Sequence, residues 1–368
     1  MFSPSTETIL SDLRALVEFE SPSDDPARVS ELAAWIVGRL RSDGVAAEAI
    51  HLSPRGDAVR ASIGPPDVAG TLLLGHLDTV WPVGTIREIP FRAEGGRIFG
   101  PGVFDMKAGI AVMMSVLPKL STRSSPPSVT LLLTPDEEVG SASSRELLVA
   151  EARKNRQVLV LEPSVEGRAK IARKGTGVFR ARFDGIAAHA GLEPEKGASA
   201  LSELSRFVLF LDSLGDTIEG TTVTPTQARA GTKSNVVPER AELTVDARIW
   251  SSSEARRIER AIEGYRPADP RVVISITGAF ERPPMEETPA SKALFEKART
   301  IAARFGFDLG GERVGGASDG NLTAAAGVPT LDGLGPAGDG AHARHEFVFA
   351  NDLGQRAALL EALLEELI

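Results

Sequence analysis

The amino-acid sequence predicts a layered α/β domain that is interrupted by a smaller α+β module of antiparallel strands. Three short apolar runs that alternate with helical stretches are typical of buried strands in an α/β sheet. Between Lys174 and about Gly278, apolar and polar residues instead alternate by two, as they do in half-buried antiparallel strands. The first pattern returns after Pro283 and Pro284, so we expect the module to be inserted into the α/β domain.

Each expected element follows from the spacing of its apolar residues. The first domain begins with amphipathic helices at residues 6–19 and 29–40. Its buried strands are expected at residues 70–75, 129–134 and 158–162, with helices at 107–120 and 143–154 between them. The alternation of these strands and helices indicates an α/β layered domain.

The inserted module combines strands at residues 179–183 and 242–249 with two helices at 198–211 and 253–265. A helix at 291–305, a glycine-rich stretch at 310–340 and a helix at 353–367 follow it. We therefore expect the first domain to comprise residues 1–173 and 284–368, and the module to comprise residues 174–283.

Composition limits the chemistry that the protein can use. The 368 residues include five histidines and no cysteine, so a metal would be held by imidazole and carboxylate groups. The formal net charge of −9 argues against binding to nucleic acid or to an anionic membrane surface. The sequence shows neither an export signal nor an apolar stretch that could span a membrane, so we expect a cytoplasmic protein.

Residues 316–320 match the Gly-x-Ser-x-Gly pattern of serine hydrolases, with Ser318 as the nucleophile and His342 after it. That pattern requires an apolar strand before the serine, whereas residues 310–316 contain one valine among glycines and charges. A serine hydrolase is therefore a distant alternative.

Imidazole and carboxylate groups follow the three apolar runs, at the strand ends where open α/β sheets place their sites. The side chains at these ends are His76 and Asp78, then Glu137 and Glu138, then Glu162. Asp78 lies two residues after His76, where a carboxylate can orient an imidazole for metal binding.

Two further segments add ligand types to the same set. Asp105 lies in a glycine-rich turn between the first two strand ends, and His342 lies in a loop near the end of the chain. Two histidines and three carboxylates suit a pair of zinc-like ions, with one carboxylate bridging them and one extra glutamate free as a base.

The order of these motifs resembles the glutamate carboxypeptidase, aminoacylase and acetylornithine deacetylase family of di-zinc metallopeptidases and amidohydrolases. The matching segments are residues 75–80, 100–107, 135–140, 162–163, 189–191 and 340–346. The resemblance implies that Asp105 bridges two Zn²⁺ ions, that His76 and Glu162 complete one site, and that Glu138 and His342 complete the other. Mn²⁺ or Co²⁺ would suit the same ligands.

The same resemblance gives the inserted module a role as a lid and as the surface of a homodimer. It implies that His189 reaches into the active site of a second copy to stabilise the oxyanion. Asn235 and Arg248 match positions that hold the free carboxylate of the substrate. Arg282 matches a position that holds an acidic side chain of the substrate. Ser318 lies in a segment that resembles a glycine loop lining the substrate.

The resemblance implies a zinc-exopeptidase-like catalytic domain, a mixed sheet flanked by helices. The implied enzyme cleaves the amide bond of an N-acyl or peptidyl amino acid with a free carboxylate, with Glu137 as general base. We expect a preference for C-terminal glutamate. An aminoacylase, a deacetylase or a small aromatic amide hydrolase of the same fold is the alternative. A non-catalytic binding protein on this scaffold should lack a ligand, and none is missing. His51 and His345 have no assigned role.

Overall fold

The computed structural model describes residues 4–216 and 220–367, which belong to two compact units. The first unit comprises Met1–Ala172, Glu287–Val314 and Ser318–Ile368, and the second comprises Arg173–Glu286 and Gly315–Ala317. Each unit has its own hydrophobic core, so each is described by itself.

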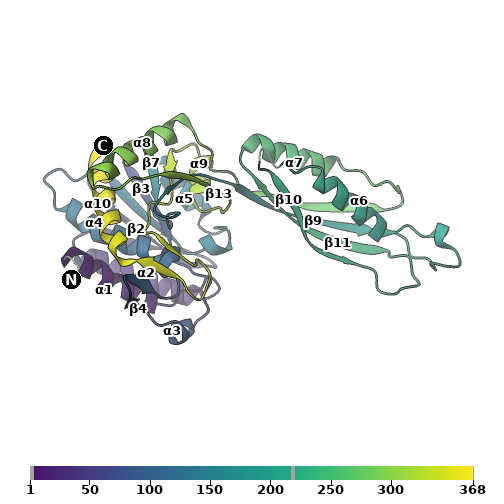
Figure 1. Ribbon diagram of the computed structural model, residues 1–368, viewed down its shortest axis with the longest axis horizontal. Helices are drawn as coiled ribbons and strands as arrows, with labels where there is room; N and C mark the ends of the chain where they lie inside the picture. Colours follow the sequence, from purple (N-terminus) through teal and green to yellow (C-terminus); the bar gives the residue numbers. More distant parts are fainter. Residues whose placement is uncertain (1–3, 217–219, 368) are drawn as a thin grey trace. The chain divides into compact units, whose positions relative to one another are not determined.

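The largest sheet of the first unit has six strands in the order β1-β2-β6-β3-β7-β14 (Figure 1). These are β1 (Ala46–Leu52), β2 (Gly56–Ile63), β6 (Val129–Thr134), β3 (Thr71–His76), β7 (Gln157–Val160) and β14 (Thr330–Leu331). Strand β3 pairs in parallel with both β6 and β7, whereas β2 pairs antiparallel with β1 and β6. The carboxyl ends of β6, β3 and β7 therefore meet at one edge of the sheet.

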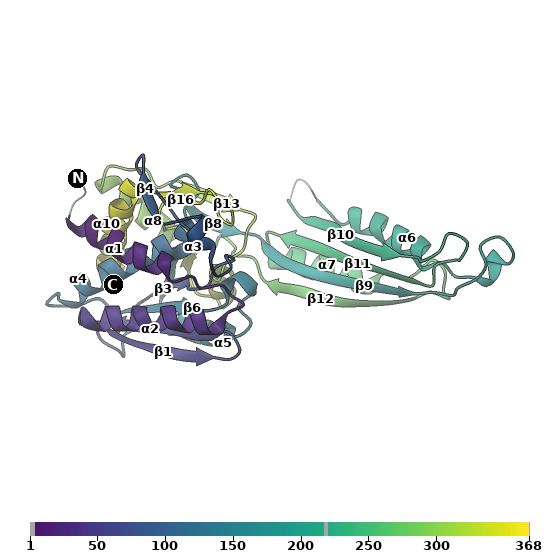
Figure 2. The same cartoon turned by 90° about the horizontal axis from the view of Figure 1, so that it is seen from below.

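Helices cover both faces of this sheet, because successive residues of its central strands point to opposite sides. Leu73 and Leu131 pack in one core with α1 (Pro4–Glu18), α2 (Pro26–Ser42), α4 (Ala108–Ser121), α8 (Pro289–Arg304) and α10 (Ala350–Glu366). Leu72 and Leu132 pack on the other face with α5 (Arg145–Arg153) and α9 (Gly320–Ala325). Figure 2 shows α2 running alongside β1.

Shorter elements complete the first unit. A second sheet has the order β15-β16-β5-β4, with β15 (Gly338–Asp339), β16 (Phe347–Phe349), β5 (Arg97–Phe99) and β4 (Arg92–Glu94). Strands β8 (Ala169–Arg173) and β13 (Gly311–Val314) form a two-stranded sheet. Single turns lie at α3 (Thr85–Glu88), η1 (Val103–Lys107) and η2 (Glu137–Val139). The pairing of β16 with β5 brings the end of the chain close to η1.

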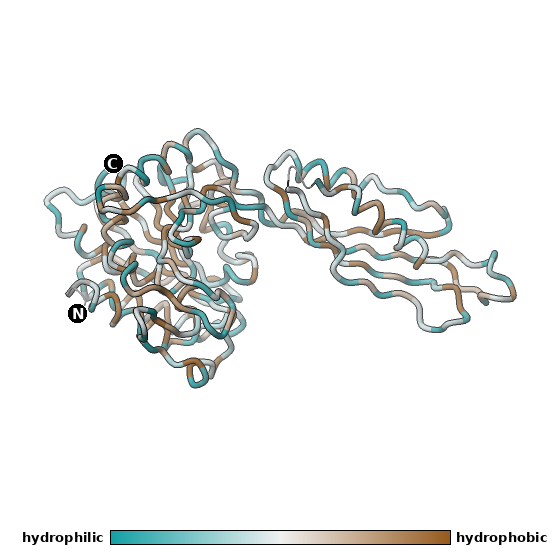
Figure 3. Tube along the Cα trace, viewed as in Figure 1, coloured by the Kyte–Doolittle hydropathy of each residue, from teal (hydrophilic) through white to brown (hydrophobic). Residues whose placement is uncertain are grey.

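The second unit is an antiparallel sheet with two helices packed on one face. Its strands, in the order β10-β11-β9-β12, are β10 (Thr222–Ala230), β11 (Arg240–Ile249), β9 (Gly175–Asp184) and β12 (Val273–Arg282). Its helices are α6 (Ala200–Asp212) and α7 (Ser252–Gly264), and η3 (Pro194–Lys196) is a single turn. Along β9, Phe179 and Phe183 face the core whereas Arg180 and Arg182 are exposed. Figure 3 shows hydrophilic and hydrophobic stretches following one another along the strands of this unit.

The mixed sheet flanked by helices and the module of antiparallel strands and two helices confirm the predicted fold class. Among the described residues, no helix combines the length and the apolar content needed to cross a bilayer.

Helix α4 packs so closely on the sheet that it leaves no room for a side chain at Gly109. A Cβ atom there would lie 2.1 Å from the carbonyl oxygen of Leu161, the residue before Glu162. By contrast, a Cβ atom at Gly38, which is exposed in α2, would meet no atom within 4 Å. Close packing thus requires glycine at position 109 but not at position 38.

We predict opposite effects of the same substitution at these two positions. Gly38→Ala should raise the free energy of unfolding by about 0.5–1 kcal/mol, because alanine restricts the unfolded chain and favours the helix. Gly109→Ala should lower it by about 1–3 kcal/mol, because the added methyl group overpacks a backbone contact. Urea unfolding of the metal-free protein measures both effects. Equal stability of the two variants would contradict the packing described above.

Candidate metal centre

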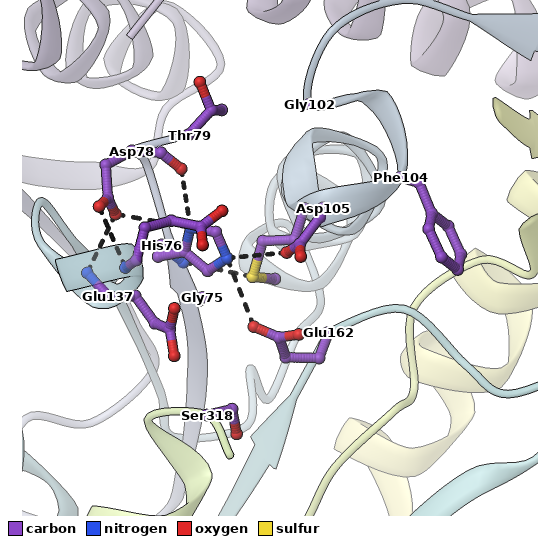
Figure 4. A network of polar contacts seen from close by, with 12 residues as sticks. Gly75, His76, Asp78, Thr79, Gly102, Phe104, Asp105, Glu137, Glu162 and Ser318 are labelled. Atoms are coloured by element: carbon purple, nitrogen blue, oxygen red, sulfur yellow. Dashed lines mark hydrogen bonds and ion pairs between the residues drawn. The ribbon is translucent and has the colours of Figure 1, made fainter. Parts of the chain in front are cut away.

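His76 stands at the centre of the converging strand ends. It is the last residue of β3 and is 1% exposed. Its Nδ1 donates a hydrogen bond of 2.9 Å to the carbonyl oxygen of Asp78, which directs Nε2 toward the carboxylates. Nε2 lies 3.1 Å from Asp105 Oδ1 and 3.4 Å from Glu162 Oε1 (Figure 4). The side chain therefore offers one ring nitrogen to a shared site.

Asp78 holds the turn after β6 against the end of β3. Its buried carboxylate accepts a hydrogen bond from the amide of Glu137 at 3.1 Å (Figure 4). It also accepts from the amide of Glu138 at 3.2 Å and from Ser23 Oγ at 2.7 Å. Its Oδ1 lies 3.5 Å from His76 Nδ1, whereas the Asp78 carbonyl oxygen lies 2.9 Å from the same nitrogen. Asp78 thus orients His76 mainly through its backbone, because two amides at the start of η2 occupy its carboxylate.

The two oxygens of Asp105 face two different imidazoles. Oδ1 lies 3.1 Å from His76 Nε2, and Oδ2 lies 3.5 Å from His342 Nε2. His342 Nε2 also lies 3.1 Å from Glu138 Oε2, and the His342 side chain is half exposed. The structure thus brings together all five side chains expected as ligands: His76, Asp105, Glu138, Glu162 and His342.

The charges of this cluster are strongly coupled. Burial opposes ionisation of Asp105, but hydrogen bonds from His342 and His76 hold its pKa below the usual range. Hydrogen bonds to Asp105 and Glu138 raise the pKa of His342 to about 10. Burial raises the pKa of Glu138. Without a metal, protonated imidazoles therefore supply the positive charge that the buried carboxylates require.

Two of the donor-atom distances match the spacing around a metal ion, and two others, of 3.1 Å each, are those of hydrogen bonds between imidazole and carboxylate. Ligand atoms around a tetrahedral ion with bonds of about 2.0–2.2 Å lie about 3.3–3.6 Å apart. Nε2 of His76 lies 3.4 Å from Glu162 Oε1, and Nε2 of His342 lies 3.5 Å from Asp105 Oδ2. Among the described residues, His76, Asp105 and Glu138 have ligand atoms within 4.8 Å of one another. Imidazole and carboxylate donors suit Zn²⁺, Mn²⁺ and Co²⁺.

Comparison with known proteins agrees with this chemistry. Residues 72–366 match the sequence profile of peptidase family M20/M25/M40, which is more than half of the chain. The chain belongs to this family. The resemblance recognised from the motifs is thereby confirmed, and the M20 protein is a metal-dependent hydrolase.

Two curated relatives align with nearly the whole M20 chain. Carboxypeptidase G2 of Pseudomonas sp. (strain RS-16) is 28% identical over 380 residues, with 100% of this chain and 92% of the relative covered. Succinyl-diaminopimelate desuccinylase of Methylococcus capsulatus is 28% identical over 378 residues, with 96% and 97% covered. The chain is thus similar to enzymes that are named for two different reactions, a carboxypeptidase and a desuccinylase.

Solved structures show the same fold. Aminopeptidase PepT from Bacillus cereus superposes with a TM-score of 0.82 at 21% identity, covering 98% of each chain. The YXEP protein of Bacillus subtilis, described as a dinuclear metal-binding peptidase of the M20 family, superposes with a TM-score of 0.73 at 16% identity, covering 98% of this chain and 97% of that chain.

Four residues singled out from the sequence, His189, Asn235, Arg248 and Arg282, belong to the second unit. Arg248 pairs with Asp246 Oδ1 at 3.0 Å and donates to the Gly315 carbonyl at 3.0 Å. Asn235 is exposed before β11, whereas Arg282 is buried at the end of β12. The substrate-binding roles of these side chains stay predictions.

His189 has a defined orientation although it is exposed. Its Nδ1 accepts hydrogen bonds from the amides of Gly191 and Leu192, each at 3.1 Å. Because Nδ1 acts as the acceptor, the proton of the neutral ring lies on Nε2. The ring therefore presents an N–H donor.

Ser318 is part of a buried turn. Its Oγ donates to Asp332 Oδ2 at 2.6 Å and accepts from the Gly320 amide at 3.1 Å. Ser318 is also only 1% exposed, and His342 faces Asp105 and Glu138 instead of this hydroxyl, which argues against the serine hydrolase alternative.

Sequence reasoning missed two buried charges beside the cluster, Glu346 and Lys107. Glu346 accepts hydrogen bonds from the turn that carries Asp105, and Lys107 is 1% exposed two residues after Asp105. Their positions inside the same motifs could have drawn attention to them.

His51 pairs with Asp57 at 2.8 Å on the β1–β2 hairpin. His345 is exposed.

A cavity of about 730 Å³ within the first unit opens onto Asp105 and Glu162. Its walls include Phe104, Phe347 and Lys170. The cavity therefore combines aromatic surface with a cationic side chain next to two of the expected ligands.

We predict that His342 stabilises the metal-free protein at neutral pH but not at high pH. The pKa of His342 is about 10 in the folded protein, above the ordinary value of 6.5. Its contribution to the free energy of unfolding is therefore complete below pH 6.5 and is lost as the pH rises through 10. The melting temperature of the wild type should exceed that of His342→Gln in EDTA at pH 6, and the difference should shrink toward pH 10.

The difference between variants is needed because Lys107 titrates in the same range. Burial lowers the pKa of Lys107 to about 8, which changes stability with pH in the opposite direction. Lys107 is present in both the wild type and the His342 variant, so its effect on stability cancels in the difference between their melting temperatures. A difference in melting temperature that stays constant from pH 6 to pH 10 would contradict the assigned role of His342.

Proposed function

We propose that the protein binds two Zn²⁺ ions and hydrolyses the amide bond of N-acyl or peptidyl amino acids with a free carboxylate. The observation that carries this proposal is the position of Asp105, whose two oxygens face His76 on one side and His342 on the other. A carboxylate that is shared in this way is suited to bridge two ions. Glu138 and Glu162 supply one further oxygen donor on each side.

Glu137 is the proposed general base. Its amide is fixed by Asp78, and its side chain extends from the same turn beside His76 and Glu162 (Figure 4). Zinc ions held by these ligands would lower the pKa of a water molecule and polarise an amide carbonyl. The Glu137 carboxylate then accepts a proton from the attacking water and returns it to the leaving nitrogen.

The preference for a C-terminal glutamate is the narrower part of the proposal. Similarity to carboxypeptidase G2 and the arginines Arg248 and Arg282 favour an acidic amino acid with a free carboxylate. Similarity to succinyl-diaminopimelate desuccinylase favours a deacylase with another amino acid product. The cavity beside Asp105 and Glu162 has room for the acyl group in either case.

We further propose a homodimer in which His189 serves the active site of a second copy. The Nε2–H donor of its neutral ring suits a developing oxyanion. Exposed apolar side chains of the second unit, Leu209 at 70% and Val273 at 62%, provide surface for contact between copies.

We predict that Glu137→Gln lowers kcat by about 10²–10⁴-fold, because the amide cannot accept the proton. Zinc content measured by mass spectrometry should remain that of the wild type. The matched control is Glu146→Gln on α5, an exposed glutamate that should leave kcat unchanged. Wild-type turnover by the Glu137 variant on N-acyl-Glu, N-acyl-Asp, N-acyl-Leu and N-aryl amides would refute the assignment.

The same variant tests the homodimer. Glu137→Gln and His189→Ala should each be inactive alone, and activity should return when the two are unfolded, mixed and refolded together. In a mixed dimer, one active site combines an intact Glu137 with an intact His189 from the other copy. Failure to regain activity, although sedimentation shows dimers, would exclude this exchange of His189.

A further inference from the structure

Glu346 accepts four hydrogen bonds although it is only 1% exposed. Its Oε1 accepts from the amides of Phe104 at 2.8 Å and Asp105 at 3.0 Å. Its Oε2 accepts from the amide of Gly102 at 2.8 Å and from Trp81 Nε1 at 2.9 Å. Three of these donors are backbone groups of the turn that carries Asp105, so this carboxylate fixes the path of that turn.

The same residue ends the loop that carries His342. The Glu346 amide donates to the Ala343 carbonyl at 2.9 Å, which closes a turn just after His342. Glu346 and Phe104 are 242 residues apart in the sequence. The carboxylate therefore joins the segment of the bridging ligand Asp105 to the loop of a ligand from the opposite end of the chain.

A buried lysine balances this charge. Lys107 lies under the same turn, is 1% exposed, and interacts electrostatically with Glu346 and with Glu20. Glu20 in turn accepts hydrogen bonds from the amides of Gly84 and Ile86, each at 2.8 Å. Burial raises the pKa of Glu346, whereas the hydrogen bonds from the three amides and Trp81 act to lower it, so these donors and Lys107 offset part of the cost of burying the carboxylate.

We propose that Glu346 is a positioning residue that sets metal affinity by holding Asp105 and His342 at a fixed separation. This inference rests on the proposed metal centre but not on the proposed substrate. His76 ends one buried strand of the sheet and Glu162 follows another, whereas His342 is itself half exposed in a loop. Loss of Glu346 therefore weakens the site of Glu138 and His342 more than the site of His76 and Glu162.

The variant Glu346→Gln tests this inference. Its amide oxygen can accept from one pair of donors, but its NH₂ group then faces the other pair. Isothermal titration with Zn²⁺ should show one site of the variant weakened by about 10–100-fold, as for other groups that orient ligands. The second site should change much less. Excess Zn²⁺ should restore most of kcat, because the reacting groups themselves are intact.

The matched control is Glu203→Gln in the second unit. Glu203 is likewise fully buried and accepts hydrogen bonds from the amides of Ala268 at 3.0 Å and Asp269 at 3.1 Å. This variant should lose stability without losing zinc affinity. Equal zinc isotherms for Glu346→Gln and the wild type, or equal losses of affinity in both variants, would overturn the inference.

Trp81→Phe provides a milder test if Glu346→Gln does not fold. It removes one donor and leaves the three backbone donors in place. It should weaken the same zinc site by a smaller factor, and an unchanged isotherm would overturn the inference. Failure of the wild type to bind two zinc ions would instead contradict the metal centre itself, so the two failures are distinguishable.

Discussion

The shared carboxylate of Asp105 is the constraint on which the rest of the site depends. Two imidazoles approach its two oxygens, and further carboxylates stand on both sides, with His76 and Glu162 buried so that their charges are poorly screened. Such a cluster is stable only with positive charge at its centre, which protons supply without a metal and divalent ions supply with one. The parallel order of β6, β3 and β7 brings most of the ligands to one edge of the sheet, and the pairing of β16 with β5 brings the late loop near η1.

Sequence alone could predict the elements whose burial is complete. Strands β3 and β6 are continuous apolar runs, so their ends, and with them His76 and Glu138, were visible as candidate ligands. The exposed strands β1 and β10 show no such run, because their positions are set by pairing with β2 and β11. Local periodicity carries no information about such pairing.

The supporting contacts of the site were beyond sequence reasoning for a related reason. The position of Glu346 in the motif of His342 is visible in the sequence, but it acts on backbone amides, which every residue possesses, so no side-chain pattern near Asp105 indicates that contact. Asp78 shows the same limit. The sequence places it two residues after His76, but it does not indicate that the Asp78 carboxylate accepts hydrogen bonds from the amides of Glu137 and Glu138. Ligand types can thus be recognised from motifs, whereas the hydrogen bonds that orient them depend on contacts between distant segments.

The bridging role of Asp105 is tested most directly by anomalous X-ray diffraction at the zinc edge from crystals of the zinc-loaded protein. We expect two anomalous peaks about 3.5–4 Å apart, one on each side of the Asp105 carboxylate, as in other dinuclear sites. One peak should lie beside His76 and Glu162, and the other beside Glu138 and His342. A single peak, or two peaks of which only one contacts Asp105, would contradict the shared carboxylate.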